Sequence, residues 1–555
     1  MIRGNEEKMT KKRLFSSFVV AFLVLGLFLV SMNFVLAENQ ELNPAPGAVI
    51  KPSAIVQVGA AQLRTPEDME KAEAILGPVI VQDIPFMPTM DPEDYILAKA
   101  KAEANVDAEN GGRIDSAKSE DIISLAPPTL KTVNRDGNNQ VSGGGAYPPD
   151  THGAAGHTQY VQIVNCRVSV YTKTGTFVKS TALNAFFGST EFVFDPTVVY
   201  DSTWKRWVML ASRRSASATD TVRRFFLAVS TTQDAAGSYW IYQPGFGGGP
   251  FNDGDWFDYP KLGMNQDAVL ITSNVFDTPA GGYKFAVMLP IAKARVYNGL
   301  GFGVPIFTGL LGTLVPPIVL DQNKDAYFVA ANNHTHLHLY RGNNLSNAYE
   351  ATLVLQSAID VTDYAAPPNA PQVGTAQKLD TLDGRFETAS TQYSDSLWNV
   401  HTIYMTPGYA TPKFYQIDIE GTGANTIKQQ GVFYEGSYSH DFNASITANT
   451  SGYAFVTWNS TDAVNPTTAS RHNARIRYSG RASGDAAGFI SAGYSLVTSS
   501  TYLSGNPSST SGVQRWGDYS YVSLDPSSFY YAWISNEKIN YTNQWGSQIA
   551  RIGFF

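Results

Sequence analysis

The sequence predicts an all-β fold, a single β-propeller, and three observations support this prediction. Gly, Ser, Thr, Tyr and Phe are abundant, whereas charged residues make up only 16% of the 555 residues, a composition typical of strands and turns. From residue 147 to residue 555, short alternating apolar runs are separated by Gly, Asn, Asp and Pro, which indicates many short antiparallel strands. Two motifs also recur within this stretch, which favours a repeat architecture.

Residues 1–37 have the features of a signal peptide. A basic stretch precedes an apolar run from Phe18 to Val30, and Ala37 is the small residue that signal peptidase requires. An uncleaved anchor over residues 14–36 is the alternative, since this segment is long enough to span a bilayer. Ser31 and Asn33 interrupt the apolar stretch, which favours cleavage. We therefore expect a secreted, periplasmic or cell-surface protein with no membrane attachment after cleavage.

Residues 38–146 are predicted to be a poorly folded lead-in or pro-segment, largely disordered with short helices. The region is rich in Ala, Pro, Glu and Asp. Thr65 followed by Pro66 is a typical helix start, and Asp91 followed by Pro92 begins a second helix. Neither helix has an apolar face broad enough for a core. A Gly/Asn stretch over residues 138–145 predicts a linker, so the propeller itself is expected over residues 147–555.

The first motif places an acidic residue before an apolar strand, followed by Asp or Asn and a second apolar strand. Its copies begin at Phe194, Phe257, Pro316, His440 and Gly517. Each copy predicts two strands joined by a tight turn. The second motif, Asp-Ala-Ala-Gly before an aromatic residue, occurs at 234–240 and 485–489 and predicts a further turn.

Together the two motifs give about four strands per unit and about seven units, which predicts a propeller of seven four-stranded blades. Six or eight blades remain open alternatives. The short first and last units could share one blade, which would close the ring and remove its open sheet edges.

Net charge, cysteine content and missing motifs argue against several classes of function. The net charge is −8 and no basic stripe is present, which argues against a nucleic-acid partner. Cys166 is the single cysteine, so no internal disulfide and no cysteine-based metal site can form. The sequence has no nucleophile elbow, phosphate-binding loop, dinucleotide fingerprint or haem motif. We predict no cofactor and expect a monomer.

These motifs resemble a family of secreted bacterial seven-bladed β-propellers of mostly unassigned function. The matching stretches are residues 150–156, 195–207, 255–263 and 515–520. The turn from Asp234 to Trp240 is also similar to a degenerate aspartate box of sialidase-like propellers, although one extra residue separates its Asp from its Gly. The resemblance covers about residues 147–555 and implies the fold and export. The box is structural in sialidase-like proteins, so it implies no glycosidase activity.

Polar residues recur where the innermost strands are expected to begin, so they would meet at one end of the channel, where loops form a pocket. The candidate ligand-binding residues there are Asp195, Asp258, Tyr259, Arg515 and Asp518. Repetition favours a scaffold role for these acids, because catalysis breaks symmetry. Positions that depart from the repeat, or lie in the Gly-rich loop before it, provide candidates for acid–base catalysis. These are His152, His157, Arg385, His440 and Asp441.

Two sets of residues could hold a metal ion. His334, His336 and His338 alternate along a predicted strand, so their imidazoles would share a face and could bind Zn²⁺. The outer two would lie ~13 Å apart, too far for one ion, and a solvent-facing polar stripe is the favoured interpretation. Structural Ca²⁺ is a further possibility, although no dense calcium-binding loop is present. The residues that could bind it are Asp201, Asn265, Asp321, Asn449 and Asp525.

The sequence thus favours a non-catalytic exported propeller that binds an extracellular glycan or protein at the loop-lined end of its channel. Aromatic residues of the loop 246–259 are expected to stack on sugar rings. The alternative is a carbohydrate-active enzyme, a glycoside hydrolase or polysaccharide lyase, that uses a His/Arg/carboxylate cluster in the same pocket. That alternative requires Arg385, His440 and Asp441 to converge.

Overall fold

The computed structural model describes residues 45–76, 82–84, 86–104, 126–213, 224–277, 282–331, 334–356, 358–420, 426–505 and 512–555. The predicted signal peptide, residues 1–37, lies outside these ranges. None of the helices within them is long and apolar enough to cross a membrane.

Consecutive strands pair side by side as antiparallel meanders, and the prediction of an all-β fold is confirmed. The first meander consists of β7 (His152–Ala155), β8 (Gln159–Val164), β9 (Arg167–Thr172) and β10 (Phe177–Ala182). The second consists of β11 (Val193–Asp201), β12 (Arg206–Arg213), β13 (Phe225–Ser230) and β14 (Tyr239–Tyr242). The third consists of β15 (Trp256–Met264), β16 (Ala268–Phe276), β17 (Tyr283–Ala292) and β18 (Phe302–Leu310).

The fourth unit begins with a strand that pairs with its neighbours on both sides. β19 (Pro317–Val319) is parallel to β15 and to β26 (Ser390–Tyr393). It precedes the meander of β20 (Ala326–Ala330), β21 (His336–Asn343) and β22 (Thr352–Leu355). The remaining strands of the fifth, sixth and last units are β27 (Ser396–Met405), β28 (Tyr409–Asp418), β29 (Ile427–Val432), β30 (His440–Ala448), β31 (Ala454–Asp462), β32 (His472–Arg481), β33 (Tyr494–Thr498), β35 (Tyr521–Leu524), β36 (Tyr531–Tyr541) and β37 (Gln544–Gly553).

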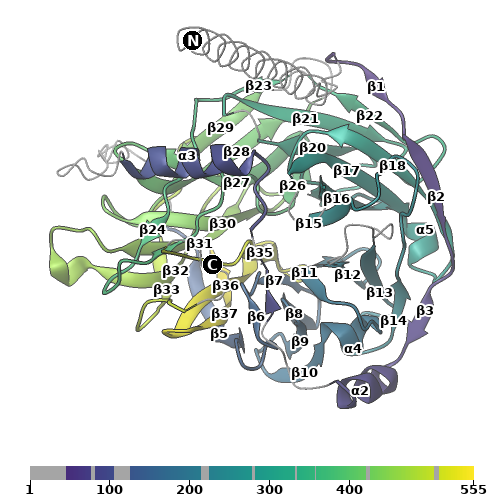
Figure 1. Ribbon diagram of the computed structural model, residues 1–555, viewed down its shortest axis with the longest axis horizontal. Coiled ribbons are helices and arrows are strands. Elements are labelled where there is room, and N and C mark those ends of the chain that lie inside the picture. The colour runs from purple at the N-terminus through teal and green to yellow at the C-terminus, as the bar shows by residue number, and fades with distance from the viewer. Residues whose placement is uncertain are drawn as a thin grey trace, which may run out of the picture. The chain divides into compact units, whose positions relative to one another are not determined.

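The first strands of these units lie around a common centre (Figure 1). Contacts run from β7 through β11, β15, β19, β26, β30 and β35, and β35 lies next to β7 again. Apolar side chains fill the space between neighbouring units. For example, Trp207 and Phe226 pack with Val161 and Val168 between the second and first units. We call β7, β11, β15, β19, β26, β30 and β35 the inner strands.

Asp and Asn side chains hold the turns that follow the inner strands. Asp201 accepts hydrogen bonds from the backbone N–H groups of Thr203 and Trp204. Equivalent backbone N–H groups donate to the side chains of Asn265, Asp321, Asn449 and Asp525. An Asx turn of this kind stabilises a tight connection between two strands. All five residues considered as Ca²⁺ ligands therefore have a structural role in turns.

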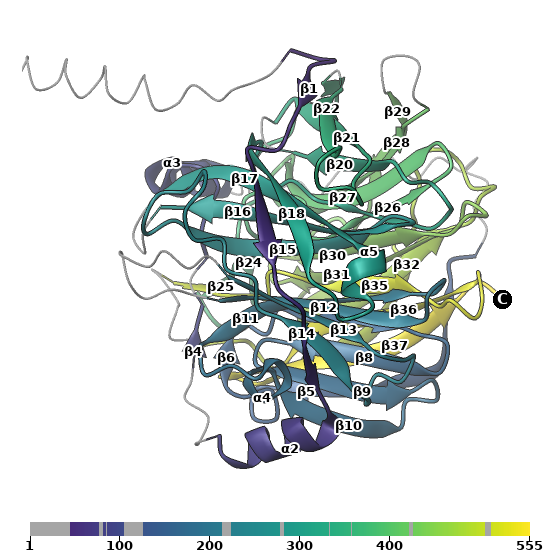
Figure 2. The ribbon, with the colours of Figure 1, turned by 90° about the vertical axis from the view of Figure 1, so that its right-hand side faces the viewer.

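The predicted lead-in differs from expectation, because several of its segments add to the sheets. β1 (Val49–Ile50) pairs with β22, β2 (Ala54–Val58) with β18, and β3 (Gln62–Arg64) with β14. These three strands follow one another along the outside of the body (Figure 2). Helix α2 (Pro66–Ala74) then packs on β10 and on α4 (Leu183–Phe187). Strands this short have little pattern of their own, since their stability comes from partner edges far away in the sequence.

The boundary predicted at residue 147 also fails at β5 (Thr129–Asn139). This strand pairs antiparallel with β37 and forms the outer edge of the last sheet, β35–β36–β37–β5. The predicted linker therefore begins inside a strand. The last unit is completed by β5, whereas the first unit has four strands of its own, so these two units do not share a blade.

Short elements connect the units. They are β4 (Gln82–Asp83), which is parallel to β6 (Ala146–Tyr147), helices α3 (Pro92–Ala104) and α5 (Lys293–Val296), the 3₁₀ turn η2 (Thr468–Ser470), β23 (Ile359–Asp360), and a small sheet of β24 (Ala370–Pro371), β25 (Lys378–Leu379) and β34 (Val513–Gln514).

Candidate functional site

A buried cluster of ionisable side chains lies where several inner strands begin. We call it the charged centre. Its members come from β11, from β15 and from the segments that precede β7, β26 and β35, and every one is at most 8% exposed. They are Asp150, Asp195, Asp258, Lys261, Arg385, Glu387, Arg515 and Asp518.

Repeated backbone irregularities shape the starts of these strands. The pairing register shifts just after Phe194 in β11, after Asp258 in β15 and after Phe442 in β30. Asp195 and Tyr259 have left-handed φ angles of 49° and 57° at these bulges. A β-bulge redirects side chains, and non-glycine residues in the left-handed region are strained and concentrate at functional sites. The strained backbone at Asp195 and Tyr259 therefore lowers local stability and sets the orientation of their side chains.

Two arginines are held by carboxylates at the outer layer of the charged centre. Arg385 donates from Nε and Nη2 to both oxygens of Asp383, at 2.7 and 2.6 Å. Arg515 donates from Nη2 to Asp518 at 2.7 Å and from Nη1 to Asp380 at 3.2 Å. Such charge-assisted contacts fix the planes of both guanidinium groups.

Lys261 is buried between two tyrosine rings. Its Nζ is 3.3 Å from the ring centroid of Tyr259 and 3.8 Å from that of Tyr519. Burial lowers the pKa of Lys261 well below its usual value, although Asp195 and Asp518 oppose this. Burial followed by neighbouring carboxylates raises the pKa of Asp195. Burial therefore favours the uncharged form of both Lys261 and Asp195.

Burial and the charge of Asp518 likewise raise the pKa of Glu387. Three members of the charged centre and the adjoining Tyr519 each have an atom with no hydrogen-bond partner among the described residues. These are Asp195 Oδ1, Lys261 Nζ, Glu387 Oε2 and the hydroxyl of Tyr519.

Residues 84 and 86–103 lie across the outer layer, and we call them the cover; most of α3 belongs to it (Figure 1). The carbonyl oxygens of Ile84 and Met87 accept hydrogen bonds from Arg515 and Arg385. The ring of Phe86 lies 4.7 Å from the Arg385 guanidinium and 5.5 Å from that of Arg515. The cover therefore contacts both arginines at once.

The α3 part of the cover adds polar contacts. The Tyr95 hydroxyl donates to Asp380 at 3.4 Å. Lys99 donates to the carbonyl of Pro367 at 2.9 Å and to the hydroxyl of Thr381 at 2.8 Å. Burial lowers the pKa of Lys99 to about 8, partly offset by nearby acids. A segment expected to be poorly folded is thus anchored by buried polar contacts.

The structure brings most of the predicted ligand-binding residues into the charged centre. Tyr259 donates from its hydroxyl to the carbonyl oxygen of Asp518, which is paired with Arg515. Asp258 and Asp518 both act electrostatically on Asp195. Arg385 stacks on Tyr259 at 4.7 Å. Their role in binding stays a prediction.

The predicted catalytic residues are placed in different surroundings. His440 packs its ring against Tyr409, 5.1 Å away. Asp441 accepts hydrogen bonds from Ser439 at 2.6 Å and from Trp458 at 2.8 Å. Neither residue shares these contacts with Arg385, which is paired with Asp383. Asp441 acts in these interactions as a buried hydrogen-bond acceptor that fixes the side chains of Ser439 and Trp458.

The two earlier histidines also separate. His152 is buried on β7 and stacks on Tyr521, with ring centroids 3.6 Å apart. Burial, followed by the charge of Lys261, lowers the pKa of His152 well below its usual value. His157 is half-buried and contacts the ring of Tyr200 near the far ends of the inner strands.

The three histidines considered for Zn²⁺ do not alternate along one strand. β21 begins at His336, and His334 has a left-handed φ of 64° outside the strand. His336 pairs with Asp360 at 2.8 Å, and His338 is 8% exposed, so the expected solvent-facing stripe is wrong for His338. Among the described residues, the acidic group with metal-compatible spacing is Asp395, Asp418 and Glu420; Lys428 pairs with its first two members.

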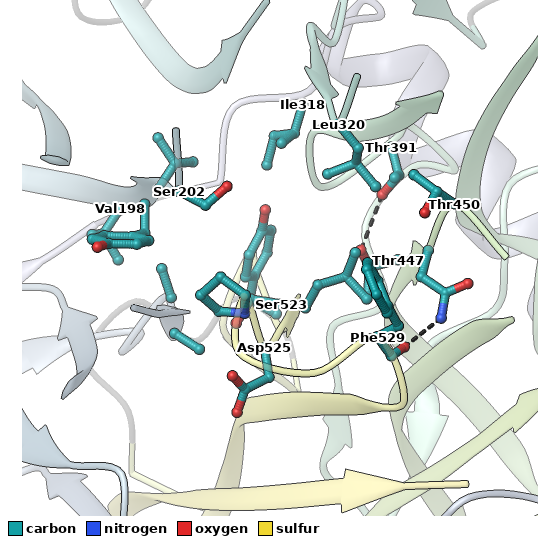
Figure 3. A pocket seen from close by; sticks show the side chains of 18 residues that line it. Val198, Ser202, Ile318, Leu320, Thr391, Thr447, Thr450, Ser523, Asp525 and Phe529 are labelled. Carbon is teal, nitrogen blue, oxygen red and sulfur yellow. Dashed lines mark hydrogen bonds between the residues drawn. The ribbon is translucent and has the colours of Figure 1, made fainter. Parts of the chain in front are cut away.

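A pocket of about 200 Å³ lies where the inner strands end (Figure 3). Hydroxyl groups and apolar side chains alternate around it, and Thr391 and Thr447 bond to each other at 3.1 Å. Its lining includes Val198, Tyr200, Ser202, Ile318, Leu320, Thr391, Thr447, Thr450, Tyr521, Ser523, Asp525 and Phe529.

Exposed aromatic residues lie beside this pocket. Phe529, which lines it, is 65% exposed, and the neighbouring Tyr530 packs edge-on against Phe555. Trp204 is 57% exposed in the turn that follows the pocket residue Ser202. The expectation that loop 246–259 offers its aromatic rings to sugars is wrong. Its phenylalanines are buried in the apolar cluster between the second and third units.

No protein-family model matches this chain, and no curated protein does. Solved structures to which it is similar include a protein of unknown function from Dyadobacter fermentans, at 10% identity over 65% of this chain and 94% of that chain, with a TM-score of 0.34. A subtype N10 neuraminidase-like protein of A/little yellow-shouldered bat/Guatemala/060/2010 matches at 10% identity over 65% of this chain and 98% of that chain, with a TM-score of 0.33. Trypanosoma rangeli sialidase in complex with sialic acid matches at 11% identity over 68% and 56%, with a TM-score of 0.34. Similarity at this level assigns neither family nor activity.

Proposed function

We propose that this chain is an exported seven-bladed β-propeller that binds an extracellular glycan at the pocket where its inner strands end. Seven inner strands in a closed series of contacts support the blade number. The apolar run and small residue before position 38 support export. The observation that carries the binding proposal is the pocket with exposed aromatic residues at its edge.

The pocket has the size and chemistry to hold one sugar ring. At about 200 Å³ it is smaller than the ~300–1,000 Å³ typical of sites that enclose a whole drug-sized ligand. A ligand would therefore insert one ring and leave the rest outside. Thr391, Thr447 and Ser523 offer hydroxyl groups that can both donate and accept hydrogen bonds, as the hydroxyls of a sugar require.

The charge of the pocket favours a neutral ligand. Asp525 is the charged residue of its lining, and its carboxylate is engaged by Lys173 at 2.8 Å and by Trp533 at 2.9 Å. A neutral sugar therefore meets no uncompensated charge there.

The aromatic residues extend the surface beyond the pocket. Exposed apolar patches of this kind mark binding sites on soluble proteins. Phe529 lines the pocket in the turn after β35, and Trp204 lies in the turn after β11, two residues beyond the lining residue Ser202. The apolar faces of sugar rings pack well on such rings, and further units of an extended glycan would lie on them.

A glycan array probed with the full chain, followed by affinity measurements on its hits, tests this proposal. Phe529→Ala should weaken binding about tenfold, or ~1.4 kcal/mol. Tyr541→Ala is the matched control, because Tyr541 is 66% exposed at the opposite end of β36. We expect it to bind as the unaltered chain does. Failure of the array to retain the protein, or equal binding by both variants, would contradict the proposal.

The competing function, a carbohydrate-active enzyme, is favoured by the clustering of Arg385, Glu387 and Lys261 in the charged centre. Incubating the full chain with each array hit and measuring new reducing or unsaturated ends distinguishes the two. The binding proposal predicts that the glycans are recovered intact.

A further inference from the structure

The partnerless atoms of the charged centre are energetically costly. Asp195 and Lys261 are 2% exposed, and Glu387 and Tyr519 are 1% exposed. Each has a polar atom with no hydrogen-bond partner in the described part of the chain. A buried polar group without a partner costs about 1–3 kcal/mol. Native proteins rarely gather several such groups unless they serve a function.

A scaffold role does not explain these atoms. The turn-holding acids show what scaffold groups look like, because Asp201 receives two backbone N–H groups, Lys293 and Tyr297. By contrast, the Asp195 backbone is held through Asn165, which also donates to Asp150, while Asp195 Oδ1 is left over. Asn165 therefore holds the Asp195 backbone, and Asp195 Oδ1 is left to accept a hydrogen bond from a ligand.

The four groups belong to one cluster. Lys261 lies on the ring of Tyr519, at 3.8 Å from its centroid. Both Asp195 and Glu387 act electrostatically on Lys261. The buried amine of Lys261 therefore lies close to the Tyr519 phenol and to the carboxyl groups of Asp195 and Glu387.

The cover closes this cluster from outside while engaging a different layer. Near the charged centre, its hydrogen bonds and ring contacts go to Arg385 and Arg515 and to their paired acids Asp380 and Asp383. These four side chains also pair with one another. The outer layer is thus satisfied with the cover in place, whereas the inner groups beneath it are not.

The balance of charge indicates what the inner groups would bind. Asp383 neutralises Arg385, and Asp518 with Asp380 neutralises Arg515. Burial favours the uncharged forms of Asp195, Glu387 and Lys261, so these groups offer little charge to neutralise a charged ligand. Donors and acceptors are both present, which suits groups that donate and accept at once, namely hydroxyls.

We propose that the charged centre is a second ligand site, that it binds a neutral polyhydroxylated ring, and that the cover must move aside for this ligand to enter. The site lies where the inner strands begin, whereas the pocket lies where they end. The proposal therefore does not depend on the glycan pocket.

Acetylation of lysines in the full-length chain, read by peptide mass spectrometry, tests the proposal. Phe86→Ala removes the ring between the two arginines, and Leu97→Ala is its matched control, because Leu97 is 65% exposed on α3. We expect Lys261 to be acetylated about tenfold faster in Phe86→Ala than in the unaltered chain or in Leu97→Ala. Tyr95→Phe, which loses only the hydrogen bond to Asp380, should increase the rate to a smaller extent.

Protection by ligand is the second readout. Methyl galactoside or myo-inositol should slow acetylation of Lys261 in Phe86→Ala, and cyclohexanol at the same concentration should not. Two results would overturn the proposal. One is that Lys261 stays unreactive in both Phe86→Ala and Tyr95→Phe, while cooperative unfolding shows that both variants are folded. The other is a reactive Lys261 that neither polyol protects. Phe529→Ala, which tests the separate glycan pocket, should change neither the acetylation rate of Lys261 nor its protection by a polyol.

Discussion

Individual buried charges in this protein are placed among several partners, and Glu435 shows the consequence. Its carboxylate accepts hydrogen bonds from Arg475 and lies 3.3 Å from both Arg477 and His472. Burial alone would raise the pKa of Glu435, but the hydrogen bond from His472 and the positive charges of the arginines outweigh it and lower the pKa to about 2.

This pKa predicts how stability depends on pH. The folded value lies below the ordinary value of 4.5, so the ionised carboxylate stabilises the fold above pH 4.5 and this contribution is lost as the pH falls to about 2. We expect Glu435→Gln to lower the free energy of unfolding at pH 7 by up to about 3 kcal/mol, with the difference shrinking toward pH 2. Urea unfolding at several pH values measures this.

Glu350→Gln serves as the control for that measurement, because Glu350 is exposed. Its difference from the unaltered chain should stay within about 0.5 kcal/mol at every pH. A Glu435→Gln difference that is equally large at pH 7 and pH 3 would contradict the assigned pKa.

Among the elements, β5 contacts both the first and the last unit. It supplies the outer strand of the last sheet, and its Val133 is 2% exposed. Val133 packs with Tyr160 and Tyr171 of the first unit and with Trp533 and Ile549 of the last. One side chain of the predicted lead-in therefore fastens the first and last units together.

Val133→Ala tests this role of β5. Loss of two buried methyl groups, at ~0.8 kcal/mol each, and the cavity left behind should lower the free energy of unfolding by about 2 kcal/mol. Leu130→Ala is the control on the same strand, because Leu130 is 38% exposed. Its expected effect is below about 1 kcal/mol. Equal destabilisation by the two changes would show that the contact between the first and last units adds nothing.

At the scale of the whole molecule, the sequence predicts the strand pairs of the propeller units well. It does not predict the N-terminal strands that complete their sheets. The Asp and Asn turns that repeat along the chain, such as those at Asp201 and Asn449, are local, so their spacing alone reveals strand pairs. β5 and the strands β1 to β3 pair with edges hundreds of residues away, and no local pattern carries that information.

The same division holds for the charged centre. Tyr259, Arg385, Arg515 and Asp518 were predicted from repeats and from their interruptions, and the structure brings them together. The helix beginning at Pro92 was predicted, but neither its place over the arginines nor the burial of Lys261 was. A lysine in a mostly apolar strand was a signal for Lys261, since such a residue is rarely buried unless it is paired or functional.

Two shortened chains separate the contribution of β5 from that of the outer strands. A chain of residues 126–555 and one of residues 147–555 both lack β1 to β3 and the cover, but only the first retains β5. We expect the shorter chain to melt lower by about 5 °C or more and to aggregate, because the edge of β37 is left unpaired. Differential scanning calorimetry and light scattering measure this. Equal melting temperatures would contradict the closing role of β5.

The pairing of β5 with β37 also sets an order of events during synthesis. Thr129 and Gly553, which face each other in the sheet, are 424 residues apart in the chain. Because β5 leaves the ribosome long before its partner exists, its backbone groups and Val133 must wait while the intervening units form. Throughout that interval the growing chain carries an unsatisfied strand at each end of its ring, which makes it a natural client for chaperones until its final strand arrives.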